Sequence, residues 1–345
     1  MAKRITLNTI AQACNTSVGT VSRALTGKTD INADTKAHIL QVARELGYRC
    51  NTLPSTVSRV LRIGVVSCRQ HNYFHGSITT GVEDARSELK NLGIDVIPIH
   101  TEYLEQNAQT ELLASLDITQ YDALLINSAG RKTAEDINRF VEEGLPVATF
   151  NTDASNSKRL FFCGSNSFSS GRLGGGLLAK LISGQGKVAV FGNFSGNESW
   201  SERFCGFYSV LKEDFPEIEL VPILQYYSND TIAFEAIKKL LVEQPDIRAL
   251  FPTNFSCTLG TLRALIELNR KDIVVIGYDI SPFVVQCLEN GFCDATLFQN
   301  PYQQGYISVK AMAHYLLNGT LPTSSQIDIP SRIILKYNLG DALEH

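Results

Sequence analysis

The sequence predicts a small all-α head of helix-turn-helix type, followed by an α/β core of two doubly wound parallel-sheet subdomains. Residues 6–47 hold three short amphipathic segments, whereas apolar runs alternate with amphipathic stretches from Leu61 onward. The charge is also uneven. Residues 1–60 contain eight Lys/Arg and three Asp/Glu, and the remaining residues contain 23 Lys/Arg and 32 Asp/Glu. A basic head on an acidic body indicates that only the head meets a polyanion.

The head begins with a helix predicted over residues 7–14. Thr6 precedes this helix as its N-cap. Ile10, Ala11 and Cys14 share one face at spacings of three and four. That face is expected to pack into the core of the head.

Two further helices complete the head. Ser17 caps the second, at residues 18–25, and the third begins at Asn32 and ends at Gly47, since glycine commonly follows a helix end. Two helices joined by a short turn have the spacing of a helix-turn-helix. Residues 1–50 are therefore the predicted DNA-binding domain.

The exposed side of the second helix carries groups suited to DNA contacts. Hydroxyls and backbone amides at a helix start bind phosphate oxygens, and an arginine can bond a guanine edge with two parallel hydrogen bonds. The residues on this side are Ser17, Gly19, Thr20, Ser22 and Arg23. A helical module that binds another protein is the alternative, because hydroxyl-rich helix starts are also common caps.

Two segments of the head, SVGTVSRAL at residues 17–25 and ARELGYRCN at residues 43–51, resemble the lac repressor family. In that family the second helix lies in the major groove of double-stranded operator DNA. The resemblance implies that Val18, Gly19 and Arg23 contact bases. It also implies that phosphates are contacted by Thr6, Ser17, Thr20, Ser22 and Asn32. Because Gly19 replaces the longer polar residue that is frequent there, specificity must also come from Val18, Arg23 or the hinge.

Residues 51–61 link the head to the core. The resemblance implies a hinge helix that folds in the minor groove where two subunits meet, with Val57 as an apolar wedge that opens a base step. Pro54 and Ser55 depart from the Ala-Arg pair frequent in the family, and a leucine is more common than Val57. Proline is tolerated in the first turn of a helix. A plain flexible linker is the alternative.

The core, residues 62–340, is predicted to contain nine strands. They are expected at residues 62–67, 95–99, 123–126, 146–150, 187–191, 220–224, 249–251, 273–277 and 295–298. Helices are expected at residues 78–92, 168–182, 202–215, 231–242 and 259–268. Nine strands exceed one comfortable sheet, so two subdomains are expected. The N-subdomain is assigned residues 62–162 and 292–324, and the C-subdomain residues 163–291 and 325–340.

Ligands of such sheets bind beyond the carboxyl ends of the strands. The residues that follow the predicted strands carry carboxylate, amide, guanidinium and aromatic groups, which suit a polyhydroxylated ligand. The candidate effector-binding residues are Asn72, Phe74, Asn151, Asp153, Trp200, Arg203, Asn254, Tyr278, Asp279 and Gln299. Each alone is also explained as a helix cap or a loop contact, but their shared topological position favours a pocket.

The core segments VIGYD at residues 275–279, FPTN at 251–254 and RFCGF at 203–207 resemble the effector domain of the same family. They also resemble periplasmic ribose-type sugar-binding proteins, so the resemblance implies a periplasmic-binding-protein-like core. It implies hydroxyl contacts from Arg203, Asn254, Asp279 and Gln299, ring stacking by Phe74 and Tyr278, and a polar contact from Asn72. Asn151 and Phe255 stand where aspartates are frequent, so a sugar or polyol is expected without a named identity.

Other chemistry is not indicated. The glycine-rich segment 171–176 lacks the Lys-Ser/Thr of a phosphate loop, so helix packing is expected there. The eight cysteines form no CxxC pair and no His cluster lies beside them, which predicts buried free thiols and no metal site. His71 and His75 flank residues 72–74 and are further candidates for ligand contact. No catalytic motif is found, so no catalytic residue, cofactor or enzyme activity is predicted.

The predicted function is a homodimeric repressor of carbohydrate-utilisation genes, switched by a sugar or polyol between the core subdomains. No leucine heptads follow Gly340, which favours a dimer over a tetramer. No secretory signal or membrane-length apolar run is found, so a cytoplasmic protein without a membrane partner is expected. The alternatives are a solute-binding protein without a DNA role and a sugar-processing enzyme. Either sign of the switch, inducer or co-repressor, is compatible with the sequence.

Overall fold

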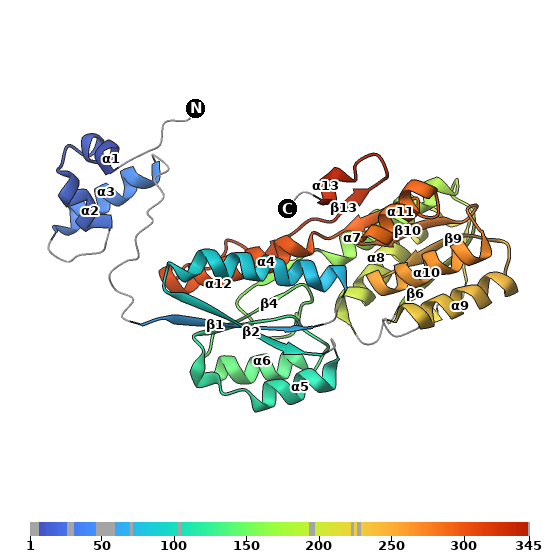
Figure 1. Ribbon diagram of the computed structural model, residues 1–345, viewed down its shortest axis with the longest axis horizontal. Helices are drawn as coiled ribbons and strands as arrows, with labels where there is room; N and C mark the ends of the chain where they lie inside the picture. Colours follow the sequence, from blue (N-terminus) through green and yellow to red (C-terminus); the bar gives the residue numbers. More distant parts are fainter. Residues whose placement is uncertain are drawn as a thin grey trace. The chain divides into compact units, whose positions relative to one another are not determined.

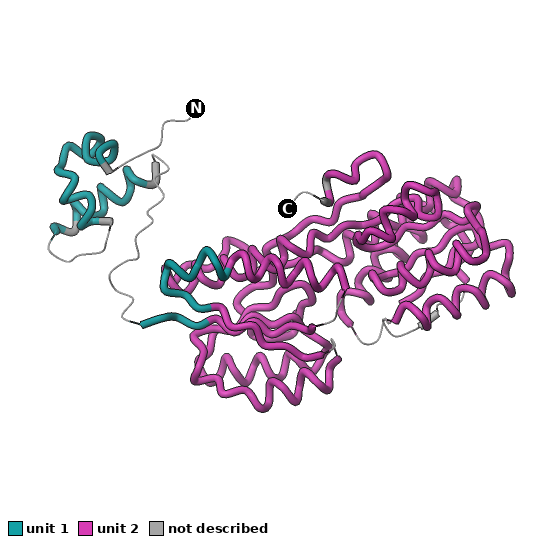
Figure 2. The backbone as a smooth tube through the Cα atoms, in the orientation of Figure 1, with its two compact units in different colours: residues 1–62, 86–95 teal, residues 63–85, 96–345 magenta. Residues whose placement is uncertain are grey.

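The computed structural model describes residues 7–25, 31–45, 59–69, 72–102, 105–192, 197–221, 224–225 and 229–343. The chain forms two compact units, residues 1–62 with 86–95 and residues 63–85 with 96–345 (Figure 2). Thr6 and Val57, which are predicted DNA contacts, lie outside the described residues, as does His71.

The described residues of the head form three helices, α1 (Leu7–Ala13), α2 (Val18–Leu25) and α3 (Ala33–Glu45). Each contributes one fully buried β-branched side chain to a common core, and these are Ile10, Val21 and Ile39. Alanines fill the space between them, so three short helices can approach closely enough to share a core. The predicted all-α head is confirmed.

The first sheet of the core has the strand order β12-β5-β4-β3-β1-β2. Its strands are β1 (Leu61–Cys68), β2 (Ile94–Thr101), β3 (Ala123–Ile126), β4 (Val147–Phe150), β5 (Phe162–Gly164) and β12 (Gln326–Asp328). The helices beside it are α4 (Tyr73–Lys90), α5 (Gln106–Ser115), α6 (Thr133–Glu142) and α12 (Pro301–Asn318), with a 3₁₀ turn at Ile118–Gln120. Helices α5 and α6 cover one face, and α4 and α12 the other (Figure 1). We call this sheet and its helices the first lobe.

The second sheet has the strand order β13-β11-β10-β9-β6-β7, and β8 also pairs with β6. Its strands are β6 (Gly186–Gly192), β7 (Ile218–Leu220), β8 (Leu224–Gln225), β9 (Ile247–Pro252), β10 (Val274–Tyr278), β11 (Ala295–Phe298) and β13 (Arg332–Ile334). Its helices are α7 (Ser167–Leu181), α8 (Glu198–Asp214), α9 (Asp230–Glu243), α10 (Phe255–Leu268) and α11 (Pro282–Asn290), and α13 (Gly340–Leu343) follows. We call this sheet and its helices the second lobe.

Both faces of the second sheet are covered. Along β6, Val188 and Val190 pack with α7 and α8, whereas Ala189 and Phe191 pack with α9 and α10. This alternation follows from the two-residue period of a strand. All described pairings of the two sheets are parallel except that of β11 with β13. The predicted core of two doubly wound parallel sheets is therefore confirmed.

The predicted boundaries between the subdomains are wrong by a few residues. Ala295–Phe298 pairs with β10 in the second sheet, although residues 292–324 were assigned to the N-subdomain. Gln326–Asp328 pairs with β5 in the first sheet, and β5 itself extends to Gly164. The chain therefore leaves the second lobe after β11 and the first lobe after β12, in each case a few residues later than predicted. A strand of three residues, such as β12, is too short to show a periodic pattern in the sequence.

Three further details differ from the sequence predictions. The strand predicted at residues 220–224 is divided into β7 and β8, and the short strands β5, β12 and β13 were not predicted. Cys205 is exposed and Cys14 half-buried, so the prediction of buried thiols fails for these two, whereas the other five described cysteines are buried. In the described part of the chain, no helix is both long and apolar enough to cross a membrane.

Glycines set how closely helices cross in both lobes. A Cβ on Gly171 of α7 would lie 2.0 Å from the carbonyl oxygen of Arg203 in α8, and one on Gly206 would lie 2.0 Å from that of Phe168. The first lobe repeats this arrangement between α4 and α12, where a Cβ on Gly81 would lie 2.1 Å from the carbonyl oxygen of Tyr302. The segment 171–176 thus belongs to a closely packed helix, as predicted.

Candidate functional site

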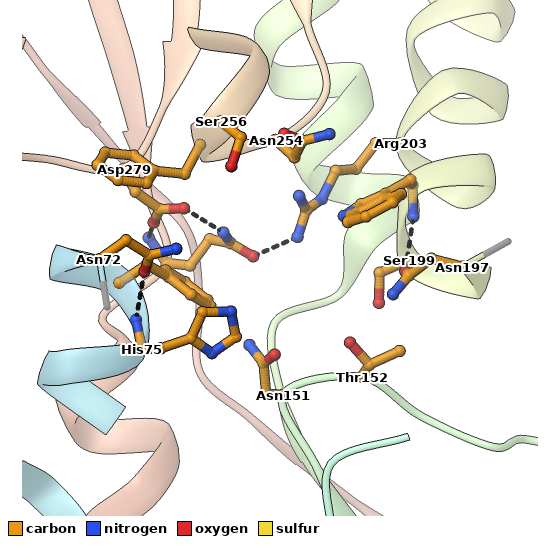
Figure 3. Close-up of a pocket in the computed structure, with 14 residues that line it drawn as sticks. Asn72, His75, Asn151, Thr152, Asn197, Ser199, Arg203, Asn254, Ser256 and Asp279 are labelled. Atoms are coloured by element: carbon orange, nitrogen blue, oxygen red, sulfur yellow. Dashed lines mark hydrogen bonds between the residues drawn. The ribbon is translucent and has the colours of Figure 1, made fainter. Parts of the chain in front are cut away.

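A pocket lies between the two lobes, at the carboxyl ends of their strands, and its empty space is about 480 Å³ with the open solvent at its mouth included (Figure 3). The first lobe supplies Asn72, Phe74, His75, Asn151 and Thr152. The second lobe supplies Asn197, Ser199, Trp200, Arg203, Asn254, Phe255, Ser256 and Asp279, and Gln299 joins them from the segment between β11 and α12. Asn151 and Thr152 lie across the pocket from Asn254 and Ser256 (Figure 3).

A chain of hydrogen bonds holds the charged residues of the pocket. Arg203 of α8 is 5% exposed, and its Nη1 donates to the carbonyl oxygen of Thr253 at 2.7 Å. Its Nη2 donates to Oε1 of Gln299, whose Nε2 in turn donates to Oδ2 of Asp279 at 2.7 Å. One uncharged amide thus connects a buried guanidinium with a buried carboxyl group (Figure 3). The geometry of these three side chains is set by the protein itself.

Two buried donors at the pocket are left over. Among the described residues, neither Nε of Arg203 nor Nδ2 of Asn254 has a hydrogen-bond partner. The other amide atom of Asn254, Oδ1, accepts a hydrogen bond from the backbone N–H of Cys257 and so caps α10. A buried donor without a partner costs ~1–3 kcal/mol, so both atoms favour a ligand that brings oxygen acceptors.

Burial shifts the protonation of two groups at the pocket in different directions. It raises the pKa of Asp279 to about 6, although the nearby Arg203 opposes the shift. It lowers the pKa of His75 to about 4, so this imidazole is neutral at pH 7. Nδ1 of His75 lies 3.3 Å from Sγ of Cys68. The pocket therefore carries little net charge near neutral pH.

The first-lobe residues of the pocket are held by local contacts. Oδ1 of Asn72 accepts a hydrogen bond from the backbone N–H of His75 at 2.9 Å, at the start of α4. Asn151 has a φ of 61°, a left-handed conformation that asparagine tolerates better than most residues. Its Nδ2 donates to Oε1 of Gln304 at 3.0 Å. Asn72 and Asn151 are thus held by different neighbours, and Gln304 in turn donates to the carbonyl oxygen of Gln299.

Tyr278 was predicted to stack on a ligand ring, and the structure contradicts this. It is the last residue of β10, and the alternation along that strand turns its side chain toward α7. Its hydroxyl lies 3.1 Å from Oγ of Ser170, and the guanidinium carbon of Arg203 lies 4.4 Å from its ring centre. Tyr278 is fully buried and supports Arg203.

Asp153 was predicted as an effector contact, but it does not line the pocket. Its carboxylate forms an ion pair with Arg159, with Oδ1 2.5 Å from Nε. The same oxygen accepts hydrogen bonds from Oγ1 of Thr149 and the backbone N–H of Ala154. These contacts organise the loop after β4, so Asp153 is a structural residue.

The other eight predicted residues all line the pocket, and these are Asn72, Phe74, Asn151, Trp200, Arg203, Asn254, Asp279 and Gln299. Their contacts with an effector stay predictions. Of the remaining lining residues, His75 was a candidate, whereas Thr152, Asn197, Ser199, Phe255 and Ser256 were not predicted. Each missed residue lies within three positions of a predicted one. The strand ends thus indicate the region, and the loop conformation decides which side chain points inward.

In the head, the start of α2 presents the predicted DNA contacts. Val18 is 40% exposed, and Gly19 and Arg23 are also exposed. Nε of Arg23 donates to the carbonyl oxygen of Gly19, and Oγ of Ser17 accepts from the backbone N–H of Thr20. Oδ1 of Asn32 accepts from the N–H of Asp34, so Asn32 caps α3, a role that was not predicted for it. Contacts of these residues with DNA stay predictions, as do those of Ser22.

Two protein families match this chain. Residues 6–51 match the family described as bacterial regulatory proteins of the lacI family, and residues 63–320 match the family of periplasmic binding protein domains. The second match covers most of the core, including the pocket.

Individual proteins agree with these matches. The ribose import binding protein RbsB of Bacillus subtilis is 28% identical over 74% of this chain and 82% of its own length. Catabolite control protein A of Priestia megaterium is 23% identical over 95% of this chain and 97% of its own. The crystal structure of GanP, a glucose-galactose binding protein from Geobacillus stearothermophilus, covers 82% of this chain and 99% of its own with a TM-score of 0.74 and 23% identity, which shows the fold. The chain therefore belongs to the periplasmic binding protein domain family, and it carries a lacI-family regulatory head.

Proposed function

We propose that this chain is a transcriptional repressor of carbohydrate-utilisation genes, and that a neutral sugar or polyol bound between its lobes controls its affinity for operator DNA. The observation that carries the proposal is the set of buried polar groups at the pocket. Nε of Arg203 and Nδ2 of Asn254 are donors without partners, and Asp279 is a buried carboxyl group beside them. A ligand with several hydroxyl groups can accept from the first two and donate to the third.

The charge of the pocket supports a neutral ligand. Arg203 and Asp279 are the charged side chains among its described lining residues, and Gln299 connects them. A phosphorylated sugar would compete with Gln299 and Thr253 for the guanidinium, whereas a hydroxyl group can use the remaining Nε. Trp200 and Phe74 offer apolar surface to a sugar ring. The similarity to a ribose import binding protein supports a sugar as the ligand, and the similarity to a catabolite control protein supports the regulatory role.

The pocket lies where a ligand can control how the lobes close. By the strands that the structure describes, the chain crosses between the two sheets three times, after β5, after β11 and after β12. Oγ of Ser155 in the first lobe donates to the carboxylate of Glu198 at the start of α8, which is a direct contact between the lobes. A ligand held by both lobes favours one arrangement of them. We propose that residues 51–61 transmit this arrangement to the heads of a cytoplasmic homodimer, with a coupling free energy of ~1–3 kcal/mol.

The DNA-binding half of the proposal is tested with the full-length protein and random-sequence duplexes. We expect selection of a palindromic site whose affinity falls steeply as the salt concentration rises, because phosphate contacts release counterions. A solute-binding protein or a sugar-processing enzyme would select no sequence. Failure to bind any duplex at low salt would therefore overturn the proposal that the chain is a repressor.

Arg23→Ala tests how the head identifies its site. We expect a loss of ~1–3 kcal/mol at the selected operator and a relaxed base preference at one position, because a bidentate arginine distinguishes guanine from other bases. Arg263→Ala is the control, since this exposed arginine of α10 pairs with Asp230 in the core. Unchanged discrimination between bases in Arg23→Ala would exclude Arg23 from the base contacts.

A further inference from the structure

Gln304 is a fully buried amide that lies near the start of α12, behind the residues that line the pocket. Its Nε2 donates to the carbonyl oxygen of Gln299 at 2.9 Å, and its Oε1 accepts from Nδ2 of Asn151 at 3.0 Å. Gln299 and Asn151 both line the pocket. One side chain outside the pocket therefore contacts two residues inside it.

The carbonyl oxygen of Gln299 sets the orientation of the Gln304 amide. A backbone carbonyl can only accept a hydrogen bond, so the group of Gln304 that faces it must be the NH₂ group. The reverse orientation would place two oxygen atoms against each other and two NH₂ groups against each other, which is costly for a buried side chain. The oxygen of the Gln304 amide is therefore directed toward Asn151.

The orientation of the Asn151 amide follows from that of Gln304. Oε1 of Gln304 can only accept, so Asn151 must turn its NH₂ group toward it, and Oδ1 of Asn151 remains for another partner. The backbone of Asn151 is held as well, since its N–H donates to the carbonyl oxygen of Cys163 at 3.0 Å. Figure 3 shows the amide of Asn151 directed into the pocket. Asn151 thus presents an acceptor to a ligand.

Three other asparagines of the pocket present the opposite group. Oδ1 of each accepts a hydrogen bond from the backbone N–H three positions along the chain, and these residues are Asn72, Asn197 and Asn254. Their oxygen atoms are used as helix caps, so their NH₂ groups are the ones left for a ligand. The asparagine side chain alone therefore does not decide between donor and acceptor, and at Asn151 the decision comes from Gln304.

We propose that Gln304 is a positioning residue of the pocket, which holds Asn151 so that its Oδ1 accepts a hydrogen bond from one hydroxyl group of the effector. This inference rests on the proposed function, in which the effector is a sugar or polyol. It adds a requirement for the effector: the position that faces Asn151 carries a free hydroxyl group, which can donate. An ether or a fluorine at that position can only accept and is rejected.

The test measures binding of sugars to the full-length protein by calorimetry. The probes are D-glucose, D-galactose, D-xylose, D-ribose and myo-inositol, and the one that binds most tightly is compared with derivatives in which one hydroxyl group is replaced by fluorine. We expect a derivative that binds at least about tenfold more weakly than its parent because its fluorine faces Oδ1 of Asn151. In Asn151→Gly this loss should fall to within about threefold, and glycine tolerates the φ of 61° at this position.

Two variants of Gln304 test its positioning role with the same derivative. Gln304→Met fills a similar volume but does not hold the amide, so Asn151 can turn its NH₂ group toward the fluorine and the loss should fall to within about threefold. Gln304→Glu has an oxygen that accepts from Nδ2 of Asn151 in either protonation state, so the tenfold loss should remain. Gln303→Met is the matched control, since it changes the neighbouring, half-buried glutamine of α12 and should bind as the wild type does.

Each outcome decides the proposal. If Gln304→Met weakens the parent sugar and all its derivatives by the same factor, Gln304 has only a structural role and the inference is wrong. If no derivative has a loss that depends on Asn151, the inference is also wrong, whereas sugar binding and the proposed function stand. Binding of no sugar or polyol of the panel would overturn both.

Discussion

The two lobes contribute to the same pocket in different ways. In the second lobe, Arg203 and Asp279 are joined through Gln299 and anchored on the backbone of Thr253, so each side chain depends on the others. In the first lobe, Asn72 and Asn151 each bond to a separate neighbour. The comparison teaches that the charged side chains of one wall are bonded to one another, whereas Asn72 and Asn151 of the other wall have separate partners. Gln304, the partner of Asn151, donates to the carbonyl oxygen of Gln299 and so connects that residue with the first network.

The backbone behind the two walls is nevertheless built alike. Gly171 and Gly206 bring α7 close to α8, and Gly81 and Gly305 bring α4 close to α12. In both lobes a helix held in this way carries pocket residues near its N-terminal end, such as Arg203 in α8 and Phe74 in α4. The difference between the walls therefore comes from the side chains and not from the helix packing.

The largest expected effect is a difference in stability between a variant of the second-lobe wall and a variant of the first-lobe wall. Arg203→Ala removes one partner of a buried network and leaves Asp279 uncompensated, so we expect the free energy of unfolding to fall by ~3–5 kcal/mol. Asn72→Ala removes one cap at the start of α4 and should cost only ~1 kcal/mol. Urea denaturation without added sugar measures both values.

A surface arginine provides the control for this comparison. Arg172 of α7 pairs with Glu213, and both side chains are well exposed, so Arg172→Ala should cost ~1 kcal/mol or less. Equal losses for Arg203→Ala and Asn72→Ala would contradict the difference between the walls.

The second expected effect is a pH dependence of opposite sign in the two lobes. The pKa of Asp279 is raised from 3.8 to about 6, so its contribution to stability is complete below pH 4 and is lost as the pH rises through 6. The pKa of His75 is lowered from 6.5 to about 4, so its contribution is complete above pH 6.5 and is lost as the pH falls through 4. Asp279 should account for up to ~3 kcal/mol, and the partly exposed His75 for less.

Denaturation of the wild type, Asp279→Asn and His75→Gln between pH 4 and 7 measures these contributions. Relative to Asp279→Asn, the wild type should lose stability as the pH rises. Relative to His75→Gln, it should gain stability over the same range. Parallel curves of stability against pH for the wild type and Asp279→Asn would show that burial does not raise the pKa of Asp279.

The smallest expected effect concerns the crossing of α7 and α8, which supports the pocket wall formed by the second lobe. Gly171→Ala places a Cβ against the carbonyl oxygen of Arg203, so we expect a loss of ~1–3 kcal/mol and weaker effector binding as Arg203 moves. Gly176 lies in the same helix with open space around it, and Gly176→Ala should stabilise the protein by up to ~1 kcal/mol. Unfolding and sugar binding are measured for both. The same effect at both positions would exclude close packing as the function of Gly171.

Much of the fold follows from sequence pattern alone. The buried strands appear as apolar runs, such as residues 123–126, and the head appears as three amphipathic helices. The short strands at 162–164, 326–328 and 332–334 could not be predicted, because three residues show no period and their pairing depends on distant segments.

The site was predictable to the level of position but not of side-chain direction. Asp279 and Asn254 were identified because they follow strands. Tyr278 failed because one more residue of β10 turns its ring to the other face, and Asp153 failed because its partner Arg159 lies in a loop whose path the sequence does not reveal. Both errors concern which way a side chain points, which is decided by tertiary structure.

The most direct test of the account is the affinity of the full-length protein for its selected operator with and without the sugar or polyol that raises its thermal stability. The wild type should change its operator affinity about 5- to 150-fold when the ligand is added. Arg203→Ala, which lacks the guanidinium at the pocket, should bind that ligand poorly and show no such change. A ligand that binds the wild-type pocket yet leaves operator affinity unchanged within twofold would contradict the claim that the pocket controls the DNA-binding head.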